Sequence, residues 1–217
     1  GVGILLDAEE TWIQDPIDRL AIELMKEYNK EKVVVYNTYQ LYRNDRLHFL
    51  QLSHRLAKEG GFLLGAKLVR GAYMEKERER AIKLGYTSPI HLNKEATDKD
   101  FDAAATYCIS NKDTISLLLA THNEASNIAI ATAMTNLSFE KNDQHVHFSQ
   151  LFGMGDHITF NMAVQGYNVS KYLPFGPINE VIPYLMRRAE ENTSVNGQTN
   201  KELVLLKTEL ARRKSSK

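Results

Sequence analysis

Two adjacent arginines, Arg187 and Arg188, lie in a predicted helix near the carboxyl end of the chain, and Glu191 follows one helical turn later. Neighbouring helical residues point about 100° apart, so the two like charges either face water or converge on an anion. A guanidinium group binds a carboxylate through two parallel hydrogen bonds. The stretch "YLMRRAEENTS" (184–194) therefore indicates either a solvated helix face or a carboxylate clamp.

Further polar side chains gather where the predicted strands end. They are Asp7 and Glu9, Asn37 and Tyr39, Lys67, Arg70 and Tyr73, Thr121, His122 and Asn123, Gln150 and Met154, and Tyr172. The carboxyl ends of parallel barrel strands meet on one face, where active sites lie. We expect a site there, although each residue also has a structural interpretation: Asp7 as a helix cap, for example, and His122 as a hydrogen-bonded strand end.

Six short apolar runs are predicted to form the strands that position these residues. They span 3–9, 32–38, 62–69, 115–123, 145–153 and 170–175. Most are continuous rather than alternating, as in strands that are covered on both faces. Helices are predicted at 15–29, 44–61, 97–111 (with Thr97 as the N-cap), 123–137 and 178–192, and "KERERAIKLG" (76–85) is expected to be a solvated helix face. This alternation predicts an α/β fold with parallel strands.

Doubly wound sheets and barrels both fit that alternation, but no G-x-G-x-x-G follows the first strand, which disfavours a dinucleotide-binding sheet. We expect a (β/α)8 TIM-like barrel with about six of its eight β/α units in this chain and the N-terminal units absent. Residues 1–195 are expected to form the C-terminal part of that catalytic barrel. Residues 196–217 are expected to form a peripheral helix and a polar tail.

Composition narrows the function. Lys plus Arg and Asp plus Glu are equal at 27 each, so no overall field favours nucleic acid. The single cysteine, Cys108, excludes an intramolecular disulfide and fits a reducing compartment. His145 and His147 alternate on one strand, but no carboxylate or cysteine lies at ligand spacing, so no metal is expected. No apolar run approaches the roughly 20 residues needed to span a bilayer.

Five motifs taken in order resemble the proline dehydrogenase family: "LLDAEET", "KLVRGAYMEKER", "ATHN", "SQLFGMGD" and "YLPFGPINEVIPYLMRRAEEN". The resemblance extends from Leu5 to about Ser194. It implies a modified (β/α)8 barrel that holds FAD and oxidises L-proline to Δ1-pyrroline-5-carboxylate by hydride transfer to the flavin N5. That reaction is the first step of proline catabolism to glutamate, and it implies a quinone as electron acceptor.

The resemblance also implies roles for individual residues. Catalytic roles fall to Asp7 and Lys67. The substrate would be bound by Arg187, Arg188, Tyr184, Tyr172, Tyr73 and Leu151. The cofactor would be bound by Ala8, Asn37, Lys67, Arg70, Gly71, Ala72, Asn93, Lys94, Thr97, Thr121, His122 and Glu191. Lys67 falls where many family members carry an arginine, and Arg70 where they carry a lysine.

The same resemblance implies a pyrroline-5-carboxylate dehydrogenase that takes the product, and a peripheral contact with the membrane that holds the quinone. The expected location is the bacterial cytoplasm or inner-membrane surface, or the mitochondrial matrix side. Three alternatives stay open: a Schiff-base aldolase or lyase that uses Lys67, a hydroxyproline dehydrogenase, and an inactive fragment. Tyr172 favours proline, because in the family a tyrosine there accompanies proline preference.

Overall fold

The computed structural model describes residues 2–194, 204, 207–208 and 210–214; the side chains of residues 187 and 189–194 lie outside that description. The chain divides into two compact units, Gly1–Lys171 and Tyr172–Lys217. The predicted tail at 196–217 falls mostly outside the described residues, and those that are described, such as 210–214, are helical.

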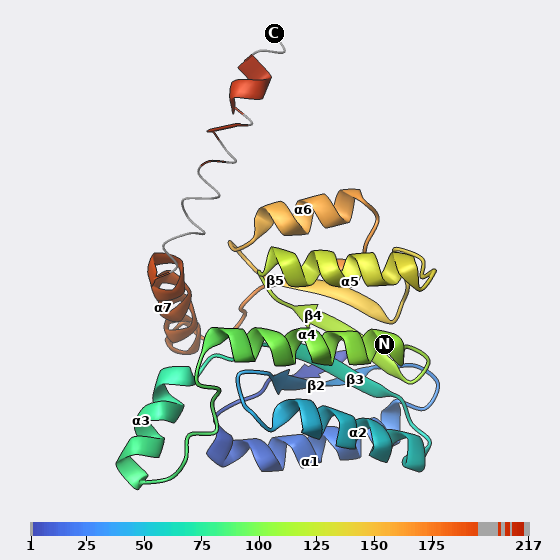
Figure 1. The fold of residues 1–217 in the computed structure, drawn as a ribbon, viewed down its shortest axis with the longest axis vertical. Coiled ribbons are helices and arrows are strands. Elements are labelled where there is room, and N and C mark those ends of the chain that lie inside the picture. The colour runs from blue at the N-terminus through green and yellow to red at the C-terminus, as the bar shows by residue number, and fades with distance from the viewer. Residues whose placement is uncertain (1, 195–203, 205–206, 209, 215–217) are drawn as a thin grey trace. The chain divides into compact units, whose positions relative to one another are not determined.

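Six strands form one sheet in the order in which they occur in the chain (Figure 1). They are β1 (Ile4–Leu6), β2 (Val35–Gln40), β3 (Leu64–Val69), β4 (Ile115–Ala120), β5 (Val146–Leu151) and β6 (Val169–Tyr172). Each neighbouring pair from β1 to β5 is parallel. Sequential order with parallel pairing is the arrangement of a (β/α)8 barrel, so the predicted fold class is confirmed.

A helix follows each strand, with one additional helix between β3 and β4. The helices are α1 (Thr11–Tyr28), α2 (Arg46–Gly60), α3 (Met74–Leu84), α4 (Lys94–Ser110), α5 (Glu124–Asn136), α6 (Asp156–Val164) and α7 (Ile178–Ser194). The sequence did not predict α6, which starts directly after the left-handed Gly155. The "FGMG" loop (152–155) ends there.

The hydrophobic core lies between the sheet and the helices, on one face of the sheet. Leu64, Ala66 and Leu68 of β3 belong to the same buried cluster as side chains of α1, α2, α4, α5 and α6, whereas Lys67 does not. Successive strand residues point to opposite faces, so Lys67 points to the other face. The second face is the interior side of the barrel wall, which fits the predicted barrel.

Two predicted helix starts were also wrong. Helix α1 begins at Thr11 rather than Asp15, and Pro16 lies inside it. The carboxylate of Glu77 accepts hydrogen bonds from the Thr11 N–H (2.6 Å) and hydroxyl (2.8 Å), and so caps the helix from a position 66 residues away. Helix α4 begins at Lys94, because the side chain of Asn93 caps it by accepting a bond from the N–H of Ala96. Thr97 therefore lies inside the helix.

Candidate active site at the carboxyl ends of the strands

Lys67 and Asp7 form an ion pair that joins the interior face of β3 to the residue after β1. The side chain of Lys67 is 12% exposed and that of Asp7 is 47% exposed. Between them, the Thr38 hydroxyl of β2 donates to the carbonyl of Leu6 (2.7 Å). The ends of the first three strands therefore meet, as the sequence predicted.

Arg70, just after β3, is bound on several sides. Its guanidinium donates to Asp98 (2.6 Å) and Thr121 (2.7 Å) and to the Ser126 hydroxyl (3.1 Å). Its Cζ atom lies 4.2 Å from the centroid of the Phe101 ring. This arrangement fixes a positive charge at the ends of β3 and β4.

Asp98 also accepts from Lys94, one helical turn earlier. Burial would raise the pKa of Asp98, but hydrogen bonds from Lys94 and Arg70 outweigh it and lower that pKa. Asp98 therefore links Lys94 to Arg70, and both of these residues are expected to bind the cofactor. Asn93 caps the same helix, and Thr97 is buried in its first turns and donates to the Asn93 carbonyl (3.4 Å).

Gly71 begins the turn between β3 and α3, with φ of 136°. A Cβ atom there would lie 2.3 Å from the Tyr42 ring, so both the backbone angle and the packing require glycine. The next residue, Ala72, donates its N–H to Gln40 Oε1 (3.3 Å). The fold therefore fixes the turn that is expected to contact the flavin.

The fourth and fifth strands contribute a further group of polar residues. The buried Thr121 hydroxyl accepts from Arg70 and from the Asn123 N–H (3.1 Å), and the Thr121 carbonyl accepts from Gln150 (3.3 Å). His122 and Leu151 are half-buried at the same strand ends, and so is Ala8 after β1. The structure thus brings together residues from five consecutive strand ends.

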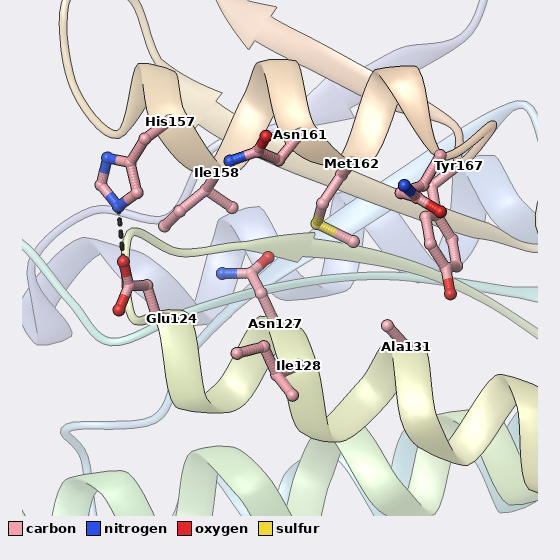
Figure 2. A pocket seen from close by; sticks show the side chains of 10 residues that line it. Glu124, Asn127, Ile128, Ala131, His157, Ile158, Asn161, Met162 and Tyr167 are labelled. Carbon is pink, nitrogen blue, oxygen red and sulfur yellow. Dashed lines mark hydrogen bonds and ion pairs between the residues drawn. The ribbon is translucent and has the colours of Figure 1, made fainter. Parts of the chain in front are cut away.

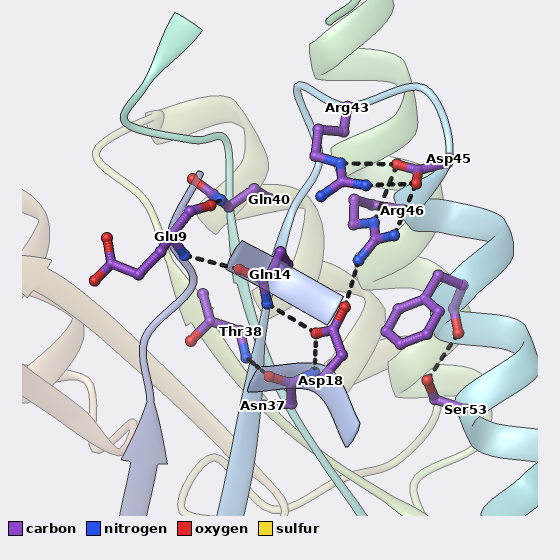
Figure 3. A network of polar contacts seen from close by, with 11 residues as sticks. Glu9, Gln14, Asp18, Asn37, Thr38, Gln40, Arg43, Asp45, Arg46 and Ser53 are labelled. Atoms are coloured by element: carbon purple, nitrogen blue, oxygen red, sulfur yellow. Dashed lines mark hydrogen bonds and ion pairs between the residues drawn. The ribbon is translucent and has the colours of Figure 1, made fainter. Parts of the chain in front are cut away.

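Asn37 does not join this group, which corrects its expected place. It is fully buried, and its amide donates to Asp18 Oδ1 on α1 (2.8 Å). Asn37 and Thr38 are neighbours on β2, so their side chains point to opposite faces, and that of Asn37 faces the helices, as Figure 3 shows. The side chain therefore belongs to a buried polar network and is removed from the cofactor set.

The remaining expected substrate residues lie in the second unit, Tyr172–Lys217. There, the rings of Tyr172 and Tyr184 are 5.6 Å apart, and Arg188 Cζ lies 5.1 Å from the Tyr184 ring centroid. Arg187 and Glu191 are in α7, and their side chains lie outside the described residues. The aromatic pair and one of the two arginines are thus adjacent.

Two residues of the first unit that contact the strand-end group were missed as site members: Gln40 and Asp98. Gln40 donates to the Glu9 carbonyl (2.8 Å) while its oxygen accepts from Ala72, and Glu9 accepts from the Tyr73 hydroxyl. For Gln40, its place at the end of β2 was the available signal. Asp98 lies within a helix, and its sequence context resembles that of any solvated acidic residue.

A cavity of about 220 Å³ lies elsewhere, between α5 and α6 on the helical side of the sheet (Figure 2). The pair Glu124–His157 (2.7 Å) closes one end, and Ile128, Met162 and Tyr167 supply apolar walls. None of the expected site residues lines it, so this cavity is separate from the strand-end group.

Within the described part of the chain, no helix is long and apolar enough to cross a membrane. Among the same residues, no three His, Cys, Asp or Glu side chains are grouped so that they could hold a metal ion.

Comparison with known proteins assigns this arrangement to a family. A family model described as "Proline dehydrogenase" matches residues 1–201. Proline dehydrogenase 1, mitochondrial, of Caenorhabditis elegans is 42% identical over 221 residues, which cover all of this chain and 36% of that protein. Hydroxyproline dehydrogenase of Xenopus laevis is 38% identical and covers 98% of this chain and 46% of its own length.

Among solved structures, proline utilization A (PutA) from Bdellovibrio bacteriovorus, inactivated by N-propargylglycine, superimposes with a TM-score of 0.83 at 28% identity. The match covers 91% of this chain and 20% of that protein. The chain thus spans about a third of the length of its C. elegans relative and a fifth of PutA.

Proposed function

The chain belongs to the proline dehydrogenase family, and from that premise we propose that its protein oxidises L-proline to Δ1-pyrroline-5-carboxylate with FAD as the cofactor. In the reaction, the carbon next to the ring nitrogen loses a hydride, the nitrogen loses a proton, and a C=N bond forms. The single observation that carries the proposal is the group of Lys67, Asp7 and Arg70 at the ends of β1 and β3, which extends to Thr121 after β4. Barrel enzymes use this location for catalysis.

The residues at these ends fit a flavin. FAD, when bound, supplies the two-electron acceptor and becomes more negative on reduction. Lys67 and Arg70 are cations, and a positive charge that is fixed before the reaction stabilises such developing charge. We propose that Gly71, Ala72, Thr121, His122, Asn93 and Lys94 contribute further contacts, together with Ala8, Thr97 and Glu191.

Asp7 has two candidate roles, to accept the amine proton of proline or to orient Lys67. The ion pair between Asp7 and Lys67 supports the second role, since the carboxylate already has a cationic partner. We therefore propose that Asp7 holds the ammonium group of Lys67 in place, and that water takes the amine proton.

The substrate carboxylate is the part of proline that a protein can grip most firmly. We propose that Arg187 and Arg188 bind it through paired hydrogen bonds, and that Glu191 offsets their repulsion. Tyr172, Tyr184, Tyr73 and Leu151 would form the walls around the ring. The contact between Arg188 and the Tyr184 ring supports this grouping for one arginine and one tyrosine.

Hydroxyproline oxidation is the second candidate, because one relative is named hydroxyproline dehydrogenase. Tyr172 supports proline, since in the family a tyrosine at this position accompanies proline preference. We propose further that electrons pass to a quinone through peripheral membrane contact, and that a pyrroline-5-carboxylate dehydrogenase consumes the product. Relatives named mitochondrial support a mitochondrial location over a bacterial one.

Competition between the two amino acids tests this assignment. The full natural protein would be incubated with equal amounts of L-proline and trans-4-hydroxy-L-proline and a redox dye. We expect the product that is two hydrogens lighter than proline to dominate. Dominance of the hydroxylated product would select the second candidate, and absence of both products would refute the proposed function.

A further inference from the structure

Three consecutive residues after β1 are each bound by a side chain from the start of α3. Glu9 accepts from the Tyr73 hydroxyl, Glu10 pairs with Lys76, and Thr11 donates to Glu77. We call these six residues the latch. Glu77 is fully buried, so the latch is anchored at one end in the interior and reaches the strand ends at the other.

Within the latch, Glu9 is the most constrained residue. Its N–H donates to Gln14 Oε1 (2.8 Å) and its carbonyl accepts from Gln40 Nε2 (2.8 Å) (Figure 3). Its carboxylate accepts from the Tyr73 hydroxyl. Backbone and side chain are thus fixed together. Gln14 and Gln40 hold the Glu9 backbone, and from this fixed backbone the Glu9 carboxylate reaches the Tyr73 hydroxyl.

The support behind Glu9 is buried and charged. Gln14, which is 1% exposed, donates to Asp18 (2.8 Å), and Asp18 pairs with Arg46 at 2.8 Å with both side chains under 10% exposed. Breaking one partner of such a buried pair is costly, so Gln14 and Asp18 have little freedom to shift. The position of Glu9 is therefore set by the folded core.

Gln40 connects this support to the second loop. Its amide spans from the Glu9 carbonyl to the Ala72 N–H, one residue before Tyr73. The loop after β1 and the turn after β3 are thus joined by a side chain of the strand between them. The ion pair between Asp7 and Lys67 also joins the loop after β1 to strand β3 itself, near the proposed reaction centre.

We propose that Glu9 is a positioning residue, which holds the Tyr73 ring in place as a wall of the substrate pocket by accepting its hydroxyl proton in a hydrogen bond. The inference rests on the proposed function, since it takes Tyr73 as a substrate contact. Glu9 itself does not touch the substrate. The Tyr73 hydroxyl is engaged in the hydrogen bond to Glu9, so the ring is the part of Tyr73 that would contact proline.

The test is a double-mutant cycle in the full natural holoenzyme, with Glu9→Ala, Tyr73→Phe and the double variant. The readouts are KM and kcat for L-proline, and the Kd for cyclopentanecarboxylate, an unreactive ring acid, measured by its perturbation of the flavin spectrum. Glu9→Ala should raise KM and that Kd about tenfold, as loss of a charged hydrogen bond predicts, while kcat changes less than about twofold. In the Tyr73→Phe background, Glu9→Ala should add less than about twofold, because its partner is already gone.

Two further variants separate positioning from general loop damage. Glu9→Gln keeps an oxygen acceptor and should restore KM to within about threefold of wild type. Glu10→Ala breaks the neighbouring ion pair with Lys76, whose Nζ atom lies 6.0 Å from the centroid of the Tyr73 ring. It keeps the hydrogen bond between Tyr73 and Glu9, and should change KM by less than about twofold.

The outcomes are distinguishable. An equal effect of Glu9→Ala with and without the Tyr73 hydroxyl would overturn the inference, as would an equal rise in KM for Glu10→Ala. If Glu9→Ala does not fold, Tyr73→Phe decides alone: a KM like that of wild type overturns the inference. A wild-type protein that does not oxidise proline would instead refute the proposed function.

Discussion

Lys67 on β3 forms an ion pair with Asp7, which follows β1, across the strand that separates them. The contact places a charged pair at the carboxyl ends of a parallel sheet, on the face that the helices leave uncovered. An ammonium group that is only 12% exposed and has a carboxylate partner is held in one direction. This is the arrangement expected of a group that stabilises charge in a reaction.

Substitution of Lys67 tests that role. Lys67→Met keeps the length of the side chain and removes its charge, so kcat for proline should fall about 100-fold while flavin stays bound. The matched control is Lys58→Met on α2, which should retain full activity. A Lys67→Met enzyme with wild-type kcat would exclude Lys67 from the reaction.

The paired arginines predict a different kinetic pattern. Arg187→Met or Arg188→Met should raise KM for proline about 10- to 100-fold, because each removes charged hydrogen bonds to the carboxylate. Flavin content, measured from the visible spectrum, should stay the same. Arg19→Met, at an exposed position on α1, is the control. A normal KM in both variants would show that the carboxylate is bound elsewhere.

The fold predicts a strict requirement for glycine at position 65. A Cβ atom on Gly65 would lie 2.2 Å from the Val35 carbonyl oxygen of the neighbouring strand. This oxygen belongs to the backbone, so it cannot move away without a cost in stability. Gly65→Ala should therefore lower the free energy of unfolding by roughly 1–3 kcal/mol. Gly3→Ala is the matched control, since its nearest atom, the Val34 oxygen, is 3.4 Å away. Equal stability of the two variants in urea titrations would refute the close approach.

His54 predicts a pH dependence of stability. Burial, aided by the charge of Lys58, lowers the pKa of His54 from 6.5 to about 4, and both ring nitrogens are hydrogen-bonded, to Tyr107 and Thr114 at 2.7 Å. The unfolded chain therefore binds the proton more readily than the folded one. The stabilisation is complete above pH 6.5 and is lost as the pH falls toward 4, by roughly 3 kcal/mol.

Urea denaturation at several pH values measures this effect. His54→Gln should flatten the dependence between pH 6.5 and 4, whereas His48→Gln, at an exposed position on the same helix, should leave it intact. A wild-type stability that is constant over this range would contradict the assignment.

The sequence predicted the parallel strands and the gathering of their ends, because apolar runs and the polar residues after them are local signals. It misplaced the start of α1, because the cap of that helix is Glu77, a residue 66 positions away. It placed Asn37 with the cofactor because the residue stands near a strand end. Side chains alternate between the two faces along a strand, and this alternation turns the Asn37 side chain toward Asp18 instead. Contacts over long sequence separations, such as Glu9 with Tyr73, carry no local pattern and become visible only in the fold.

Anaerobic titration of the purified full natural protein with L-proline measures whether proline reduces a bound flavin. The expected result is a bound flavin whose oxidised absorbance band disappears as proline is added, with one equivalent of Δ1-pyrroline-5-carboxylate formed for each flavin reduced. A protein that purifies without flavin, takes up none when FAD is supplied, or keeps an unchanged spectrum in excess proline would contradict it.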